Sequence, residues 1–328
     1  MIPYSFTQLV FFFIVYCFIG WIIESTWVSA HQKKFVNRGF MRGPVIPIYG
    51  SGAMMLLLAS SPFLKYPWAV FIAGMIGCSV LEYFTGAAME AIFKVRYWDY
   101  SDKKFNLNGH ICLFTSVCWG ILSLAENYFI HKPIAALSVL IPEKVLSAIT
   151  ILLSVVFIVD LTLAFKAAFD LRALIIRMEK AKEELRLMQK RLDVMLAYVN
   201  EDMEERRAHN REAIDDWSDS VENKLEQMSD KFESGIDNLT DNIAETFTKI
   251  KSKMEAIPEE LSTNMKEELY ELRAKFGLHK GRKSEKGFFE DFYKRGIFLG
   301  NPSLKSTKFT ETVEDLKKLM EKMREEKH

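Results

Sequence analysis

The chain has 328 residues, and its 43 Lys and Arg balance its 43 Asp and Glu, which gives a formal net charge of zero. A balanced charge argues against a general nucleic-acid binder, which carries a basic excess. The balance hides a split, because residues 1–93 are mostly apolar whereas charges recur every two or three residues from residue 166 onward. This split excludes a single soluble globule. The four cysteines all fall in apolar segments, which excludes a secreted disulfide scaffold and predicts buried thiols rather than a metal site.

Five apolar segments are predicted to cross a membrane. A helical span needs roughly 17 to 25 predominantly apolar residues. The predicted spans are Ser5–Trp27, Pro44–Ser60, Trp68–Phe93, Ile111–Ile130 and Val145–Ala168. The second span is short and rich in Gly and Pro. The expected fold class is therefore all-α, with a polytopic helix bundle as its membrane domain.

The basic residues of the loops predict the orientation of these spans in a cell membrane. Loops one and three and the segment after the fifth span carry several Lys or Arg each, whereas the N-terminal segment and loops two and four carry few. Cytoplasmic loops are enriched in Lys and Arg. We therefore expect the N-terminus outside, and loops one and three and the C-terminal region in the cytoplasm. An odd number of spans agrees with termini on opposite sides.

A charged helical region follows the last span. From Leu171 to Val199 apolar residues recur alternately every three and four positions, which predicts a left-handed coiled coil. From Ile214 to Met254 the spacing becomes an eleven-residue repeat, which favours a straight or slightly right-handed bundle. The acidic character of this second stretch argues against binding to an anionic membrane surface. We therefore predict a transmembrane domain over residues 1–168 and a cytoplasmic rod over residues 169–257 that self-associates or packs on another rod.

Residues 258–328 form a third predicted region, a cytoplasmic tail that begins at the helix breaker Pro258. Between Lys275 and Phe298 basic side chains are interleaved with Phe and Tyr, a composition that suits contact with anionic lipid or nucleic acid. We favour the alternative interpretation, a solvated linker that carries a small docking element. Thr310 to Arg324 then shows the pattern of one last amphipathic helix.

Ionisable residues inside the spans are candidates for function, because burying them in a bilayer is costly. These residues are Glu24, Glu82, Glu90, Glu126 and Asp160. With the predicted orientation, Glu126 lies near the outer end of its span and is expected to face the interface. The other four acids lie in the cytoplasmic half of the membrane, close in depth to the arginines of loops one and three.

Loops one and three extend the candidate site. Loop one enters the second span through a Gly- and Pro-rich segment at residues 37–50. Irregular backbone at membrane depth is tolerated only where it lines a cavity or is buried in protein. The candidate binding residues are Glu24, Arg38, Arg42, Tyr49, Glu82, Glu90, Arg96, Asp99, Asn108, His110 and Asp160. Two hypotheses remain open: the acids form structural ion pairs with the loop arginines, or they form a transport site that binds cations or protons.

Several short motifs resemble one family of bacterial membrane proteins. They are Gly20–Glu24, Arg38–Phe40 with Gly43 and Pro44, Pro47–Gly50, Glu82–Gly86 with Glu90, Trp98–Ser101, Asn108–Leu113, and Ser116 with Trp119 and Gly120, joined more loosely by Arg295, Asn301–Pro302 and Lys305–Ser306. In these motifs the chain is similar to the family described as Putative ABC-transporter type IV, or CmpB-like. His110 departs from the family pattern, which more often has Arg there, so a titratable group replaces a fixed charge. The resemblance implies a multispanning membrane protein that serves as a transport permease, and it implies no substrate.

Two functions follow as alternatives. The first is a permease-like component of a transport system. The sequence has no Gly-x-x-x-x-Gly-Lys-Ser/Thr loop, so this function requires a separate ATP-binding subunit. Five spans are few for a permease, so we also expect a homo-oligomer, which the rod can assemble. The second is a membrane-anchored coiled-coil scaffold or signalling protein without transport activity. Because no nucleophile–base arrangement or metal-ligand spacing occurs, we expect no enzyme activity, cofactor or metal.

Overall fold

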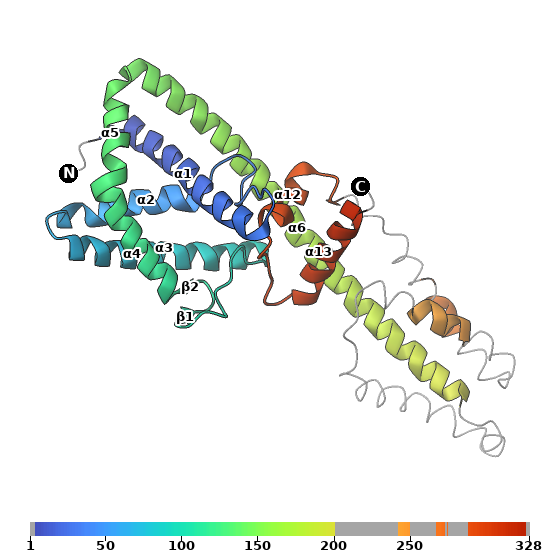
Figure 1. Cartoon of the computed structure of the whole chain (residues 1–328). Coiled ribbons are helices and arrows are strands. Elements are labelled where there is room, and N and C mark those ends of the chain that lie inside the picture. Colours follow the sequence, from blue (N-terminus) through green and yellow to red (C-terminus); the bar gives the residue numbers. More distant parts are fainter. Residues whose placement is uncertain (1–3, 201–241, 250–266, 273, 275–287, 326–328) are drawn as a thin grey trace, which may run out of the picture. The chain divides into compact units, whose positions relative to one another are not determined.

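The computed structural model describes residues 4–200, 242–249, 267–272, 274 and 288–325, and the described chain is mostly helical. The elements are α1 (Phe6–Gln32), α2 (Pro47–Ser60), the 3-10 helix η1 (Ser61–Phe63), α3 (Pro67–Phe93), β1 (Asn106–Leu107), β2 (Ile111–Cys112), α4 (Leu113–Ala125), the π-helix η2 (Glu126–Ile130), α5 (His131–Leu140), α6 (Glu143–Asn200), α12 (Phe292–Gly300) and α13 (Thr310–Glu325). Figure 1 shows these elements in the order of the chain. Two compact units divide them: residues 1–173 with 288–328, and residues 174–287.

Four described helices are long and apolar enough to cross a membrane, which confirms a helical membrane domain. They are Phe6–Gln32, Pro67–Phe93, Leu113–Leu140 and Glu143–Met195. The second predicted span is not among them, because α2 has 14 residues and extends only about 21 Å at 1.5 Å per residue. A bilayer core of about 30 Å is therefore longer than α2 alone. The fourth span is also longer than expected, because η2 joins α4 to α5 in one continuous helical run.

The helices of the first unit place the loops at two opposite ends. At one end the amide of Gln8 donates to Ser138 at 3.1 Å, and Asn127 donates to Ser60 at 2.9 Å. At the other end Arg38 of loop one donates to the carbonyl of Tyr97 in loop three at 3.3 Å. Loops one and three therefore lie at the same end of the helices. The count of five spans, with α2 as the short one, and the cytoplasmic position of this end stay predictions.

Small residues allow the first helices to approach closely. Gly20 of α1 lies against the ring of Tyr49 in α2, and Gly74 of α3 lies against Ser123 of α4, so closely in both cases that a Cβ atom would collide. Close backbone approach through small residues is a common packing mode of membrane helices. In contrast, a Cβ at Gly77 would meet Met55 at 3.5 Å, an ordinary contact distance.

Loop three and the C-terminal tail join the same end of the bundle. Within loop three β1 and β2 pair antiparallel, with Leu107 opposite Ile111, and Gly109 turns the chain at a positive φ of 72°. Arg96 and Lys305 form an antiparallel bridge through backbone hydrogen bonds of 2.7 and 3.1 Å. The bridge ties the tail, which carries α12 and α13, to the end of α3 (Figure 1). Helix α13 spans Thr310–Glu325 and confirms the predicted last helix.

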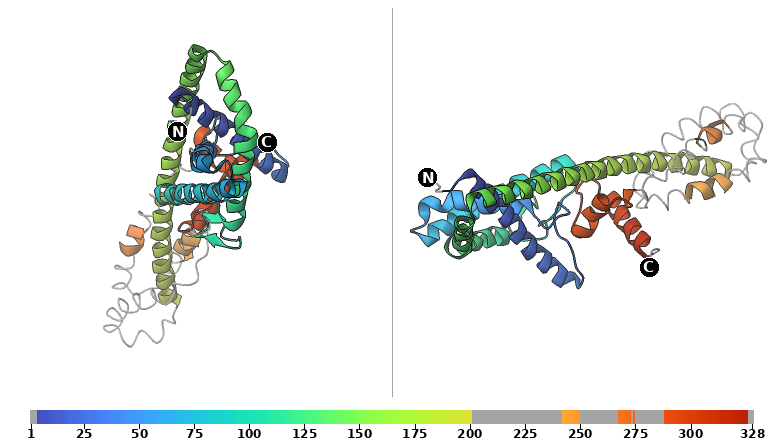
Figure 2. Two further views of the ribbon diagram at one scale, coloured as in Figure 1. Left: turned by 90° about the vertical axis from the view of Figure 1, so that its left-hand side faces the viewer. Right: turned by 90° about the horizontal axis from the view of Figure 1, so that it is seen from above.

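Helix α6 continues from the fifth span into the predicted rod as one uninterrupted helix (Figure 2). Seven residues of the predicted heptad seam are buried within this single chain: Leu171, Leu174, Met178, Leu185, Met188, Leu192 and Met195. Two later segments contact α6, since Gln189 donates to Thr246 at 3.5 Å and Arg191 pairs with Glu268 at 3.7 Å. The seam is therefore at least partly covered by its own chain, and self-association through it stays a prediction. Most of the eleven-residue repeat, and Pro258, lie outside the described residues.

Replacing Gly74 tests the close packing of α3 on α4. Gly74→Ala places a methyl group against Ser123 and should lower the free energy of unfolding by about 1–3 kcal/mol, the usual cost of overpacking. Gly77→Ala on the same helix is the matched control. It should be neutral or slightly stabilising, because helical Ala is favoured over Gly by about 0.5–1 kcal/mol. Thermal melting of both full-length variants in detergent measures the difference, and equal melting temperatures would contradict the packing.

Cysteine labelling tests the orientation of the two ends. In a Cys118→Ser background, a membrane-impermeant maleimide added to intact cells should label Tyr66→Cys in loop two but not Lys34→Cys in loop one. The physical reason is the excess of basic residues in loop one, which favours retention in the cytoplasm. Permeabilised cells should then label Lys34→Cys. Labelling of Lys34→Cys from outside in intact cells refutes this orientation.

Candidate functional site

A cavity of about 910 Å³ lies within the first unit, where loops one and three meet the helices. Its lining includes four of the candidate residues, Glu24, Arg38, Tyr49 and Glu82. The lining comes from α1, α2, α3, α4 and α6, from both loops, and from Asn301 of the tail. This volume is within the range of ligand pockets, about 300–1,000 Å³.

Arg38 neutralises one carboxylate of the cavity and holds three parts of the chain together. Its Nε lies 3.1 Å from Glu24 Oε2, in an ion pair whose arginine side is only 12% exposed. Its guanidinium also donates to Asn301 Oδ1 at 2.9 Å and to the carbonyl of Tyr97 at 3.3 Å. A planar guanidinium with five donors suits such simultaneous contacts. The structure therefore gives Glu24 the counter-charge that the ion-pair hypothesis expects.

Glu82 has no such counter-charge. It is 6% exposed, and its carboxylate accepts hydrogen bonds from Trp119 Nε1 at 2.9 Å and from the hydroxyl of Tyr100 at 3.3 Å. No described Lys, Arg or His lies within ion-pair distance of it. Burial, followed by the charge of Glu82, raises the pKa of Tyr100, so this phenol keeps its proton and donates it in the hydrogen bond.

Aromatic rings supply much of the remaining cavity wall. The rings of Tyr49 and Trp119 lie 5.8 Å apart, and the Tyr49 hydroxyl donates to Glu24 at 3.2 Å. Further aromatic residues of the lining are Trp27, Phe40, Phe93, Tyr97, Trp98, Tyr100, Phe114 and Phe165. Sequence reasoning did not identify Trp119 and Tyr100 as partners of Glu82. Their places in the Trp98–Ser101 and Trp119-Gly120 motifs were the only available signal, and a motif does not reveal which helix face meets a cavity.

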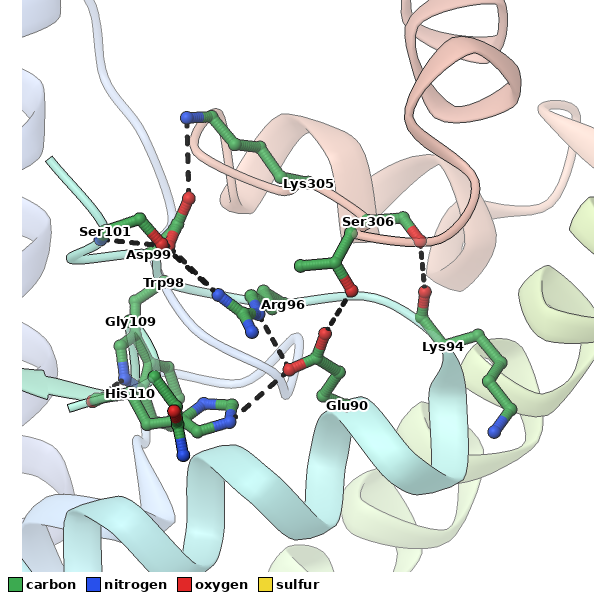
Figure 3. Close-up of polar contacts among 12 residues, drawn as sticks. Glu90, Lys94, Arg96, Trp98, Asp99, Ser101, Gly109, His110, Lys305 and Ser306 are labelled. Atoms are coloured by element: carbon green, nitrogen blue, oxygen red, sulfur yellow. Dashed lines mark hydrogen bonds and ion pairs between the residues drawn. The ribbon is translucent and has the colours of Figure 1, made fainter.

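A second group of candidates, which we call the clasp, comprises Glu90, Arg96, Asp99 and His110 and lies beside the bridge to the tail (Figure 3). Arg96 donates to Glu90 at 2.7 Å and pairs with Asp99 at 3.3 Å, and its side chain is 11% exposed. His110 Nε2 lies 3.4 Å from the same Glu90 carboxylate. From the tail, Thr307 donates to Glu90 at 2.6 Å and Lys305 lies 3.5 Å from Asp99. These four candidates are thus structural partners of one another and of the tail.

Burial and charge set the protonation of the clasp. Burial on its own favours neutral Asp99, but hydrogen bonds from Ser101, the charge of Lys305 and a hydrogen bond from Arg96 lower the pKa of Asp99 below its ordinary value. Burial and the neighbouring charge of Arg96 lower the pKa of His110, against the opposing effect of Glu90 and Asp99. The contact of His110 with Glu90 is therefore not a permanent ion pair.

The remaining candidates lie outside the cavity lining. Asp160 of α6 accepts the backbone amides of Arg42 at 3.4 Å and Gly43 at 2.8 Å, so it fixes the turn of loop one. The guanidinium of Arg42 instead donates to the backbone carbonyls of Gly39 and Gly296. Asn108 donates to the hydroxyl of Tyr83 at 3.0 Å. The eleven candidates therefore separate into cavity residues, clasp residues and loop supports.

The position expected for Glu126 is wrong. Instead of facing the interface it is 2% exposed, and none of the described groups donates a hydrogen bond to its Oε1. Beside it the hydroxyl of Tyr16 contacts His131 Nδ1 at 3.0 Å, and His131 Nε2 contacts the hydroxyl of Tyr4 at 3.0 Å. Glu126 begins the π-helix η2, whose wider turn shifts the helix phase. Pattern reading that assumes a regular α-helix cannot anticipate this shift.

Arg96 and Lys305 provide matched tests of the clasp. Arg96→Gln leaves Glu90 and Asp99 without their buried counter-charge and should lower the free energy of unfolding by about 3–5 kcal/mol. Lys305→Gln removes an ion pair whose lysine is 55% exposed and should cost only about 0–1 kcal/mol. Thermal melting of the full chain in detergent compares the two. A larger loss for Lys305→Gln would show that the tail, not Arg96, stabilises this end.

The clasp should weaken on mild acidification. The pKa of His110 is lower in the folded chain than its unfolded value of about 6.5, so the unfolded chain binds more protons below that pH. Stability is therefore fully present above pH 6.5 and declines as the pH falls toward the folded pKa. The melting temperature between pH 7.5 and 5.5 should fall less for His110→Gln than for the wild type. The exposed His31→Gln control should keep the wild-type slope, and an unchanged slope in His110→Gln would contradict the assignment.

Comparison with known proteins gives one result. The family model described as Putative ABC-transporter type IV matches residues 11–165, which include most of α1, all of α2 to α5, the cavity lining except Asn301, and the clasp. No curated protein and no solved structure matches the chain. The matched residues coincide with the helical membrane domain and with the motifs of loops one and three. Residues 11–165, the membrane part of this chain, are therefore similar to the family described as Putative ABC-transporter type IV.

Proposed function

We propose that the chain is the permease-like component of a transport system and that the 910 Å³ cavity is its solute-binding site. The observation that carries this proposal is a desolvated carboxylate, Glu82, in a cavity surrounded by membrane helices. Burying a carboxylate inside a membrane domain costs free energy, so a buried carboxylate there indicates a functional site. The family match and the four long apolar helices support a role in transport.

A separate ATP-binding subunit completes the proposed system, because the sequence contains no phosphate-binding loop of the Gly-x-x-x-x-Gly-Lys-Ser/Thr type. The loop end that carries the clasp and the tail is the cytoplasmic face in the predicted orientation, and it is where such a subunit would bind. The apolar heptad seam of α6 is the proposed site where more than one copy of the chain assembles. These partners are part of the proposal.

A scaffold function remains the second candidate, and the long α6 is the observation that favours it. A scaffold uses α6 and its later segments for interaction and has no need of an accessible cavity. The two functions therefore make different predictions: blocking the cavity should change ATP hydrolysis by a permease complex, and it should have no effect on a scaffold.

The native cysteines offer a direct test. The expectation of buried thiols is wrong for Cys118, which is exposed and lines the cavity, whereas Cys17, Cys78 and the second lining cysteine, Cys112, are buried. The full chain should be purified from its native membrane under mild conditions and reconstituted, and ATP hydrolysis by the preparation should be measured. A bulky maleimide on Cys118 should reduce this hydrolysis several-fold, because it occupies the solute site. Cys118→Ser should abolish the effect of the maleimide. Absence of any associated ATP hydrolysis, with an oligomer of this chain alone, would support the scaffold instead.

A further inference from the structure

The two carboxylates of the cavity differ in their partners. Glu24 is paired with Arg38, and this pair leaves no net charge. Among the described residues, Glu82 accepts hydrogen bonds only from the neutral donors Trp119 and Tyr100, so no cationic side chain is paired with it. Lys103 also belongs to the lining, but it lies in exposed loop three. Buried charges in proteins are normally paired, so a cation bound beside Glu82 would supply the partner that the described chain does not.

The walls around Glu82 favour a cation that carries an apolar body. Trp119 and Tyr100 bind Glu82 directly, and Tyr49 lies 5.8 Å from Trp119. Indole and phenol rings attract cations through their electron-rich faces. The lining also contains the buried Tyr97, whose hydroxyl has no hydrogen-bond partner among the described groups. A ligand can therefore find one charged, one polar and several aromatic contacts in the same space.

Other classes of ligand fit less well. Within the described residues no group of three or more His, Cys, Asp or Glu could hold a metal ion. Hard cations such as Ca²⁺ require six to eight oxygen ligands, which aromatic walls do not supply. An anion would face the charge of Glu82, while Arg38 is already engaged by Glu24 and Asn301.

We infer that the cavity binds an organic monocation, an ammonium group with an apolar or aromatic body. The ammonium lies near Glu82, and the body packs on the aromatic rings that include Trp119 and Tyr49. This inference names the substrate class of the solute site and rests on the proposed permease function. The compact clasp, by contrast, has all its charges paired and is not part of this site.

Two probes of the same shape isolate the contribution of charge. Phenyltrimethylammonium carries a positive charge, and tert-butylbenzene is its uncharged isostere. Binding of each to the full chain in lipid nanodiscs is measured by titration of tryptophan fluorescence, because Trp119, Trp27 and Trp98 line the cavity. Phenyltrimethylammonium should bind saturably and at least tenfold more tightly than tert-butylbenzene.

Variants assign this preference to Glu82. Glu82→Gln keeps the size and hydrogen-bonding capacity of the side chain and should abolish the tenfold preference. Trp119→Phe, which keeps a ring but removes the donor to Glu82, should weaken binding of the charged probe by a smaller factor. Asp102→Asn removes one carboxylate from exposed loop three and should leave the preference unchanged. Melting temperatures close to that of the wild type confirm that each variant is folded.

The outcomes separate this inference from the proposed function. Equal affinity for both probes, unaffected by Glu82→Gln, overturns the inference and leaves a cavity that binds neutral solutes, so the permease function stands. Absence of saturable binding by either probe also overturns the inference, and the effect of the Cys118 maleimide on ATP hydrolysis then decides the proposed function independently. A preference that persists in Glu82→Gln places the cation elsewhere and overturns the assignment of Glu82.

Discussion

The folded loop end of the membrane domain depends on one constraint: charged groups that leave water must find partners inside the protein. Arg38 satisfies this constraint most broadly, because one guanidinium binds Glu24 of α1, the carbonyl of Tyr97 in loop three and Asn301 of the tail. Removing one partner of such a partly buried pair leaves an uncompensated charge and is destabilising. The arginine therefore makes helix, loop and tail mutually dependent, and the cavity forms among the three.

Glu82 is the exception among the carboxylates of the cavity and the clasp, because no described cationic side chain is paired with it. Glu24, Glu90 and Asp99 all have arginine partners, whereas Glu82 has only neutral donors around it. A protein that can place an arginine beside three acids has the means to neutralise a fourth. The missing counter-charge, together with the aromatic walls, suits a cation that enters from outside the chain. From the sequence, structural ion pairs and a binding site were alternative explanations of the acids. In this account both are present, since three acids are ion-paired and Glu82 is the proposed binding carboxylate.

Part of this arrangement is readable from the sequence. Hydropathy locates the long helices, and the loop charges group loops one and three, which the structure brings into contact through Arg38. The acids within the spans include both carboxylates of the cavity. The sequence pattern does not predict which way a side chain points after an irregular helical turn, or which distant segments come into contact. The π-turn at Glu126 rotates that side chain into the protein, and Asn301 reaches the cavity from a segment more than 260 residues after Arg38. Neither the turn nor the return of the tail leaves a periodic signal.

Hydrogen exchange of the full chain in lipid nanodiscs tests most directly whether Arg38 holds this end together. In the wild type, amides of residues 296–306 should be strongly protected, because the tail is bridged to Arg96 and bound by Arg38. Arg38→Gln should raise exchange in residues 296–306 and 97–100 together, while the α1 residues 8–20 keep their protection. Free exchange of residues 296–306 in the wild type, or protection that survives Arg38→Gln unchanged, would contradict the account.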